Sequence, residues 1–102
     1  MLAALAAFAL LPIIARAQTA HSMFNSKCAA CHGADGAGTT AMGRMMHIPS
    51  FNSAPVRKMT NAKLAAIITH GKTPMPAFQG QLTKRQIGEL VEYIRTLQKQ
   101  KR

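Results

Sequence analysis

Apolar residues recur at intervals of three and four positions in three stretches of the chain, and this spacing predicts three helices. The first covers 20–32, where Phe24, Cys28 and Cys31 share one face. The second covers about 60–70, and the third runs from 83 to about 98. Their apolar stripes are Leu64, Ile67 and Ile68, and then Ile87, Leu90, Val91, Ile94 and Leu97. No β-hairpin signal occurs, so the pattern predicts an all-α chain with long loops.

Polar residues and glycines mark the ends of these helices. Thr60 or Asn61 can cap the second helix, and Gly71 can end it in the left-handed conformation. The stretch 83–86 has the capping-box pattern that opens the last helix. Gly88 lies inside that helix at a cost of about 1 kcal/mol relative to alanine. Such a cost predicts a packing reason, such as another helix that crosses close by.

The connecting segments are rich in glycine and proline. Three glycines within 33–38 break the first helix. The apolar residues of 39–56 have no clean period, so we expect a loop or short helical turns there. The segment 72–80 is a proline-rich loop in which two prolines flank Met75 and restrict its backbone to extended geometry.

The first residues have the pattern of an export signal. Residues 2–14 are almost wholly apolar, and Ala15-Arg16-Ala17 fits the small-x-small rule for signal cleavage. The apolar stretch is shorter than the about 20 residues that a spanning helix needs. We therefore expect a signal peptide over 1–17, a mature domain over 18–102 and a periplasmic location. No basic residue precedes the apolar run, so an upstream start and a retained weak anchor both stay open.

The chain is strongly basic, because 13 Lys and Arg residues stand against 3 Asp and Glu and give a formal net charge of +10. Such an excess keeps a protein soluble, and it steers a protein toward an acidic partner or an anionic membrane face. No nucleic-acid motif accompanies the charge, and aromatic residues are not interleaved with it. We therefore expect no nucleic-acid partner.

The stretch Cys28-Ala29-Ala30-Cys31-His32 matches Cys-x-x-Cys-His, the signature of c-type haem attachment. Residues three and four apart share a face of a helix, so both sulfurs and the imidazole can point to the same side. The sulfurs can then form thioethers to the porphyrin edge while the imidazole reaches the iron. The sequence therefore predicts one covalently bound haem c.

Other uses of these residues are weaker. A disulfide across so short a loop would stabilise the fold little. A thioredoxin-like Cys-x-x-Cys needs a βαβ context, and a zinc site usually needs a second Cys or His pair at matching spacing. The chain has only two cysteines, and its other histidines, His21, His47 and His70, stand alone. A covalent haem would also give a small domain a large apolar body to pack against.

The order of these features resembles the class I c-type cytochromes, in particular the small bacterial mono-haem members. A Cys-x-x-Cys-His helix comes first, then a loop methionine between prolines, then an amphipathic helix with an aromatic residue. The phrases Cys-His-Gly-Ala-Asp-Gly-Ala-Gly, Met-Pro-Ala-Phe and Val-Glu-Tyr-Ile-Arg look like that group, and the resemblance covers nearly all of 20–98. It implies the cytochrome c fold, with three main helices and long loops wrapped around one covalently bound haem.

The resemblance also implies a role for each matching residue of the site. Cys28 and Cys31 would bind the haem vinyl carbons. His32 would be the proximal ligand of the iron, and Met75 would be the distal ligand.

Two further contacts follow from the same resemblance. Phe24 and Tyr93 would meet where the first and last helices cross. Pro49 would offer its carbonyl to the second ring nitrogen of His32 and so orient the imidazole.

Met75 differs from the other methionines because it lies in a proline-restricted loop, which lowers the entropy cost of holding a ligand at the iron. The others are expected to fill gaps in the core: Met23, Met42, Met45, Met46 and Met59. Two alternatives to Met75 stay open, namely His47 as the distal ligand and an open coordination position.

A haem iron with His and Met ligands has no position for a substrate, and Met ligation raises the reduction potential. We therefore expect an exported electron carrier rather than an enzyme, acting as a monomer in short-lived complexes with acidic redox proteins. Peripheral contact with an anionic membrane is a second use of the charge. Lys72, beside the ligand loop, is either a solvated lysine or a charge near the exposed haem edge.

Two other functions stay open. One is a haem subunit held permanently in a larger periplasmic oxidoreductase, which an exposed apolar patch within 42–51 would favour. The other is a haem enzyme or sensor with an open iron position.

Overall fold

The computed structural model describes residues 3–4, 6–7 and 19–100. Most of the predicted signal peptide over 1–17 lies outside the described residues, so it stays a prediction. The described part contains six helices: α1 (Ala20–Lys27), α2 (Ala29–His32), α3 (Ala41–Met45), α4 (Ala54–Arg57), α5 (Asn61–His70) and α6 (Lys84–Gln100). Two isolated bridges occur in that part of the chain but no strand. The fold is all-α, as the pattern predicted, and none of the described helices is both long and apolar enough to cross a membrane.

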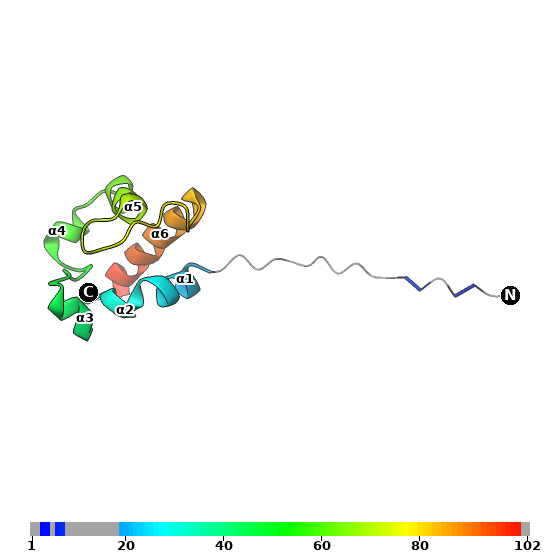
Figure 1. Cartoon of the computed structure of the whole chain (residues 1–102), viewed down its shortest axis with the longest axis horizontal. Helices are drawn as coiled ribbons and strands as arrows, with labels where there is room; N and C mark the ends of the chain where they lie inside the picture. Colours follow the sequence, from blue (N-terminus) through cyan, green and yellow to red (C-terminus); the bar gives the residue numbers. More distant parts are fainter. Residues whose placement is uncertain (1–2, 5, 8–18, 101–102) are drawn as a thin grey trace.

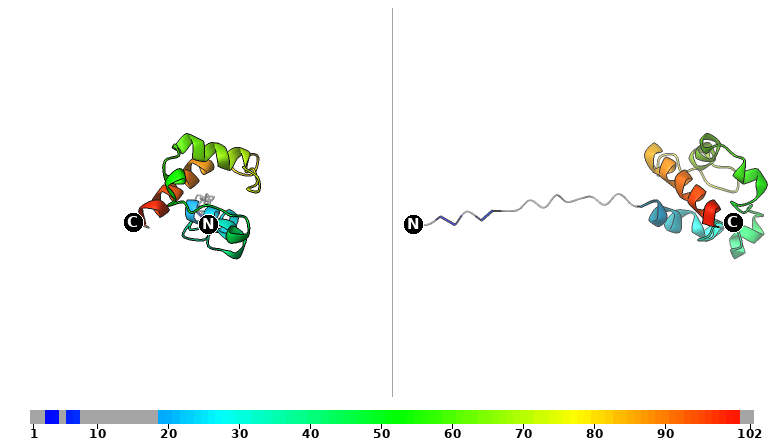
Figure 2. Two further views of the ribbon diagram at one scale, coloured as in Figure 1. Left: turned by 90° about the vertical axis from the view of Figure 1, so that its left-hand side faces the viewer. Right: turned by 180° about the vertical axis from the view of Figure 1, so that it is seen from behind.

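Helix α6 lies between α1 on one side and α5 on the other (Figures 1 and 2). Its apolar stripe provides five of the thirteen buried hydrophobic residues of the described core, among them Leu90 and Val91 at 1% and 3% exposure. Met23 and Phe24 of α1 are also almost fully buried. The ring centroids of Phe24 and Tyr93 are 5.1 Å apart, so the predicted contact of the first and last helices is confirmed.

The helix ends follow local chemistry. The Thr60 hydroxyl accepts a hydrogen bond from the Lys63 backbone N–H at 3.1 Å and caps α5. Gly71 follows that helix with a φ of +76°, a conformation that favours glycine. At the start of α6, the Thr83 N–H donates to the Gln86 side chain at 2.9 Å, while the Gln86 N–H donates to the Thr83 hydroxyl at 3.1 Å. The predicted capping box is therefore confirmed.

The predicted helix over 20–32 is divided at Cys28, which ends α1 and begins α2. Its φ of −118° departs from the helical value, although it stays in the right-handed region. Backbone bonds continue on both sides, because the Cys28 N–H donates to the Phe24 carbonyl at 2.8 Å and the His32 N–H donates to the Cys28 carbonyl at 2.9 Å. The two helices thus form one run with a bend at the first cysteine.

The expectation that another helix crosses close to Gly88 was wrong. A Cβ atom added at Gly88 would meet nothing within 4 Å, so no helix crosses there. The close approach is at Gly43 in α3, where an added Cβ would lie 2.6 Å from the Cys31 carbonyl oxygen and 2.5 Å from that of Gly38. Glycine is therefore needed where α3 packs on α2.

Five methionines were expected to fill gaps in the core, but only two of them do. Met23 is fully buried and Met59 packs against the core, as predicted. Met42, Met45 and Met46 are instead 42%, 70% and 41% exposed. Gly43 is the buried residue of the short helix α3, and Met45, two positions later, falls on the opposite side of the helix, while Met42 and Met46 flank the buried face. We call these three residues the methionine face.

Candidate haem site

The Cys-x-x-Cys-His turn lies where α1 meets α2. Cys28 and Cys31 are partly buried and unpaired, with no disulfide between them. Burial raises the pKa of the Cys28 thiol to about 11; the Lys27 charge opposes this rise and Cys31 adds to it. Cys28 is therefore protonated at neutral pH. Two free thiols on one helical turn are the groups that thioether attachment of a haem requires.

His32 is suited to bind a metal as the neutral imidazole. Burial lowers its pKa from the ordinary value, and a neutral ring nitrogen has the lone pair that a metal needs. Its ring packs against Phe51 with centroids 4.9 Å apart and planes at 32°. The Nδ1 atom is buried and has no hydrogen-bond partner among the described residues. The hydrogen bond to Pro49 that the resemblance implied is thus absent.

The loop after the turn and α3 hold its backbone in place. The Thr40 hydroxyl donates to the Cys31 carbonyl at 2.7 Å and accepts from the Gly43 N–H at 2.9 Å. The Gly38 N–H donates to the His32 carbonyl at 2.8 Å. The last two carbonyl groups of the short helix α2, those of Cys31 and His32, are therefore satisfied by neighbouring elements. Sequence reasoning assigned no such role to Thr40 or Gly43.

Met75 lies in a loop that is fixed by hydrogen bonds at both ends. The Met75 N–H donates to the Lys72 carbonyl at 2.7 Å, and the Lys72 N–H donates to the Met75 carbonyl at 3.1 Å. Further along, the Phe78 N–H donates to the Ile68 carbonyl of α5 at 3.0 Å. An added Cβ at Gly71 would lie 2.8 Å from the Met75 carbonyl oxygen, so the loop passes close over the end of that helix.

The predicted site residues share one core. Met75 is partly buried and packs against the core directly, whereas His32 reaches it through Phe51. His47 is exposed and lies after α3 with a φ of +53°. Of the two candidate distal ligands, Met75 is therefore the one that the fold holds against the core.

Phe51 is a residue that sequence reasoning did not single out. It is 7% exposed, contacts Phe24 edge to face at 6.0 Å, and fills the space beside Gly36, where an added Cβ would lie 2.2 Å from its ring. Its carbonyl accepts a hydrogen bond from the buried Gln98 side chain at 2.8 Å. The end of α6 thus holds the residue against which His32 packs.

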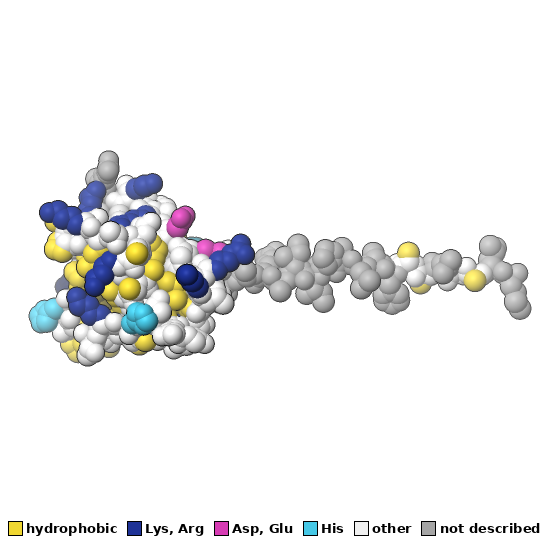
Figure 3. Space-filling view, turned by 90° about the horizontal axis from the view of Figure 1, so that it is seen from above, with side chains coloured by type: hydrophobic (Ala, Val, Ile, Leu, Met, Phe, Trp, Pro, Cys, Tyr) yellow, Lys and Arg dark blue, Asp and Glu magenta, His cyan; other side chains and the backbone are white. Residues whose placement is uncertain are grey.

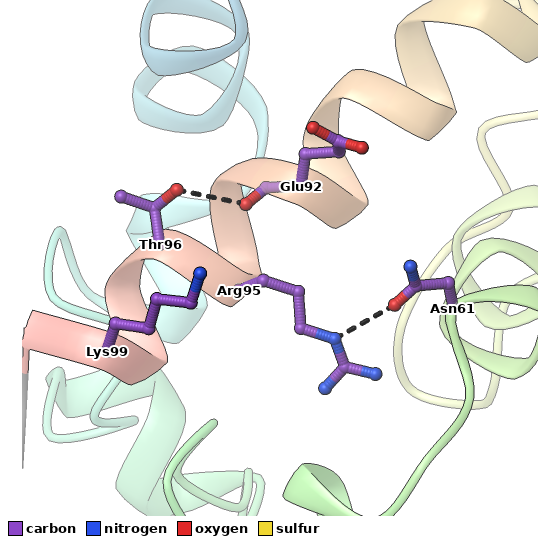
Figure 4. A pocket seen from close by; sticks show the side chains of 5 residues that line it. All are labelled: Asn61, Glu92, Arg95, Thr96 and Lys99. Carbon is purple, nitrogen blue, oxygen red and sulfur yellow. Dashed lines mark hydrogen bonds between the residues drawn. The ribbon is translucent and has the colours of Figure 1, made fainter.

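Arg95 ties the same helix to the start of α5. Its guanidinium donates to the Asn61 side chain at 2.9 Å, to Gln98 at 3.0 Å and to the Met59 carbonyl. A shallow pocket lies beside it and is lined by Asn61, Glu92, Arg95, Thr96 and Lys99 (Figure 4). Because all of the guanidinium nitrogens are engaged, Arg95 acts as a structural brace.

Basic side chains far outnumber acidic ones, so most of the basic side chains can form no ion pair. Arg85 and Glu89 form an exposed ion pair at 3.4 Å, but 13 basic residues face only 3 acidic ones. In one view, Lys and Arg side chains surround a central group of hydrophobic ones, and acidic side chains are confined to one side (Figure 3). Lys72, next to the Met75 loop, is exposed.

The family described as "Cytochrome C oxidase, cbb3-type, subunit III" matches residues 15–94. The chain belongs to this family of c-type cytochromes. The chain is similar to "Cytochrome c6" of Leptolyngbya boryana, with 35% identity over 72 residues, which cover 71% of this chain and 81% of the relative. Among solved structures it resembles the "KustC0563 c-type cytochrome", with a TM-score of 0.71 and 25% identity over 78% of this chain and 96% of the other.

This membership decides the cofactor and the broad function. The protein is a small c-type cytochrome with covalently bound haem c, and it transfers electrons with redox partner proteins. The fold is the cytochrome c fold. The residues present fit the cofactor, because the described part offers two free thiols, a neutral, partly buried imidazole with an unpartnered nitrogen, and a thioether in a fixed loop.

Proposed function

We propose that this protein is an exported carrier of one electron whose haem is joined to Cys28 and Cys31 and ligated by His32 and Met75. The observation that supports this most is that the attachment turn and the Met75 loop are both braced by backbone hydrogen bonds and both pack on the same core. A ligand set held this firmly moves little when the iron changes oxidation state. When bound, the haem supplies the one-electron redox chemistry.

Each residue of the proposed site has a separate task. Cys28 and Cys31 attach the haem through thioethers, and partial burial raises the pKa of the Cys28 thiol, which makes it less prone to oxidation before attachment. His32 binds as the neutral imidazole. Met75 raises the reduction potential and occupies the last coordination position. With no position left for a substrate, the protein does not act as an enzyme.

We propose that the partners are acidic redox proteins that bind briefly to a monomeric carrier. The excess of basic residues supports this, since complementary charge speeds encounter more than it tightens binding. Lys72 lies beside the Met75 loop and would orient a partner there. The same charge allows peripheral contact with an anionic membrane face, and no nucleic-acid partner is proposed.

The proposed location is the periplasm. It rests on the apolar segment and the Ala15-Arg16-Ala17 pattern, which support a signal peptide over 1–17 and a mature mono-haem domain over 18–102. Haem attachment to exported chains in the cytochromes that this sequence resembles supports the same location.

A second candidate function is a haem subunit held permanently in a larger oxidoreductase. The methionine face favours it, because Met42, Met45 and Met46 expose apolar surface on a helix that packs on the attachment turn. The matching family is also described as a subunit of an oxidase. A complex that survives high salt during purification from the native membranes would support this candidate; release of the monomer at high salt would support the free carrier.

The test of the ligand assignment compares Met75→Ala with Met45→Ala in the holoprotein. Met75→Ala should abolish the near-infrared sulfur-to-iron band of the ferric form, lower the reduction potential and allow imidazole to bind the iron. Met45 is 70% exposed, so its variant should keep the band. An unchanged spectrum in Met75→Ala would show that another group is the distal ligand.

A further inference from the structure

The methionine face differs from the rest of the described chain in its composition as well as in its exposure. Within the described residues, the exposed large hydrophobic side chains are Met42, Met45 and Met46, and all three are methionines. Of the thirteen buried hydrophobic residues of the core, in contrast, only Met23 is a methionine, and the others are Leu, Ile, Val and Phe. Sulfur, rather than apolar area alone, therefore distinguishes this face.

The three thioethers lie on one side of α3. Met45 and Met46 come three and four positions after Met42, and this spacing puts Cβ atoms about 5–6 Å apart on a helix. A methionine side chain has three rotatable bonds, so the three sulfurs can converge on one ion. Arg44 comes two positions after Met42, which places it on the opposite side of the helix from that residue.

The backbone beneath the methionine face is held by hydrogen bonds. The Thr40 hydroxyl accepts from the Gly43 N–H at 2.9 Å, and the Met46 N–H donates to the Met42 carbonyl at 2.9 Å. After the helix, the Ile48 N–H donates to the Gly43 carbonyl at 2.9 Å. The residues that carry the sulfurs thus start from a fixed backbone, which lowers the cost of gathering them around a ligand.

His47 offers a fourth donor beside the thioethers. It follows Met46 directly, is exposed, and has a φ of +53° where the chain turns after α3. Its N–H donates to the Arg44 carbonyl at 3.3 Å, so a backbone hydrogen bond closes the turn. An imidazole suits copper as well as zinc, iron and nickel.

The chemistry of these donors selects the class of metal. Within the part of the chain that the structure describes, no group of three or more His, Cys, Asp and Glu residues could hold a metal ion. Calcium and magnesium need oxygen ligands, and zinc needs thiolate, imidazole or carboxylate ligands. Thioether sulfur is a soft ligand that selects Cu(I).

We propose that Met42, Met45 and Met46, with His47 as the fourth ligand, bind one Cu(I) ion at the protein surface. The site is separate from the four residues that hold the haem in the proposed function, so neither assignment depends on the other. The competing explanation is an apolar docking face, which needs exposed area but no sulfur. Leucine separates the two, because exchange of Met for Leu conserves volume and apolar character.

The experiment dialyses the reduced holoprotein, without oxygen, against Cu(I) held by a soluble chelator, and native mass spectrometry counts the bound ions. Wild type should bind one Cu(I). The triple variant Met42→Leu, Met45→Leu and Met46→Leu should bind none, and His47→Ala should bind more weakly than wild type. Met59→Leu is the matched control, because it makes the same exchange at a methionine that packs against the core, and it should bind one Cu(I).

Nuclear magnetic resonance of the wild-type ferrous holoprotein provides a second readout that needs no variant. The methyl signals of Met42, Met45 and Met46 should shift when Cu(I) is added, whereas the Met75 methyl signal should stay in place. Zn(II) at the same concentration should move none of the three.

Three results would overturn the inference: no Cu(I) bound by wild type, one Cu(I) still bound by the triple leucine variant, or methyl signals that do not move. A Met75 signal that moves together with the other three would also contradict a site separate from the haem. Loss of the sulfur-to-iron band in wild type, with one Cu(I) still bound on the methionine face, would refute Met75 ligation and leave the copper site in place.

Discussion

Gln98→Leu offers the sharpest test of how the C-terminal helix supports the haem site. Gln98 is 6% exposed, and its Nε2 atom donates to the Phe51 carbonyl at 2.8 Å in the buried interior. Leucine has a similar size and keeps the packing, but it has no donor. The substitution therefore leaves the Phe51 carbonyl buried and unpaired, and it also removes one of the acceptors of Arg95.

The magnitude follows from the lost partner. An unpaired buried carbonyl costs about 1–3 kcal/mol, out of a total folding stability of roughly 5–15 kcal/mol. In a domain of this size each kcal/mol lowers the melting temperature by about 4–8 °C. We therefore expect a fall of roughly 4–24 °C. Arg95 keeps its bonds to Asn61 and Met59, so it adds little to the loss.

The assay is thermal unfolding of the holoprotein, followed by the absorbance of the haem and by far-ultraviolet circular dichroism. Amide hydrogen exchange adds a local measurement, since the Phe51 N–H donates to the Gly36 carbonyl and should exchange faster in the variant. Gln100→Leu, on the exposed end of the same helix, is the control and should change the free energy of unfolding by less than about 0.5 kcal/mol. Equal stability of Gln98→Leu and wild type would refute the reasoning.

Three other predictions concern helix packing and partner encounter. Gly88→Ala should stabilise the holoprotein by about 1 kcal/mol in thermal unfolding, because the added methyl group meets open space within a helix; a loss of stability would contradict the described packing. Gly43→Ala should instead destabilise it and weaken haem attachment, because the methyl group would lie 2.6 Å from the Cys31 carbonyl oxygen; a neutral result would mean that α3 does not pack on the attachment turn. Electron transfer to an acidic partner, followed by stopped-flow absorbance, should slow steeply as salt is raised, whereas a flat profile would argue against electrostatic steering.

The regular elements could be predicted because their signals are local. The stripe of α6, the Thr60 cap and the capping box at Thr83 depend on residues within one or two helical turns, and all three are present. The Cys-x-x-Cys-His motif is equally local, since five consecutive residues contain both thiols and the imidazole. Such features depend only on nearby residues, so they can be predicted without the tertiary structure.

The contacts that were missed join residues far apart in the sequence. Phe51 lies in a stretch without periodicity, and its partners Gln98 and Phe24 are 47 and 27 positions away. Gly43 looks like any loop glycine until α3 is placed on the Cys31 carbonyl. The prediction at Gly88 was wrong for the opposite reason. A glycine within a helix suggests a close neighbour, but the tertiary structure places none there.

The optical spectrum of the purified holoprotein in both oxidation states tests the central claim most directly. We predict a low-spin spectrum with the near-infrared sulfur-to-iron band in the ferric form, and loss of that band in the Met75→Ala variant would establish Met75 as the sulfur ligand. A high-spin spectrum without that band would contradict the electron-carrier account and would favour a haem protein with an open iron position.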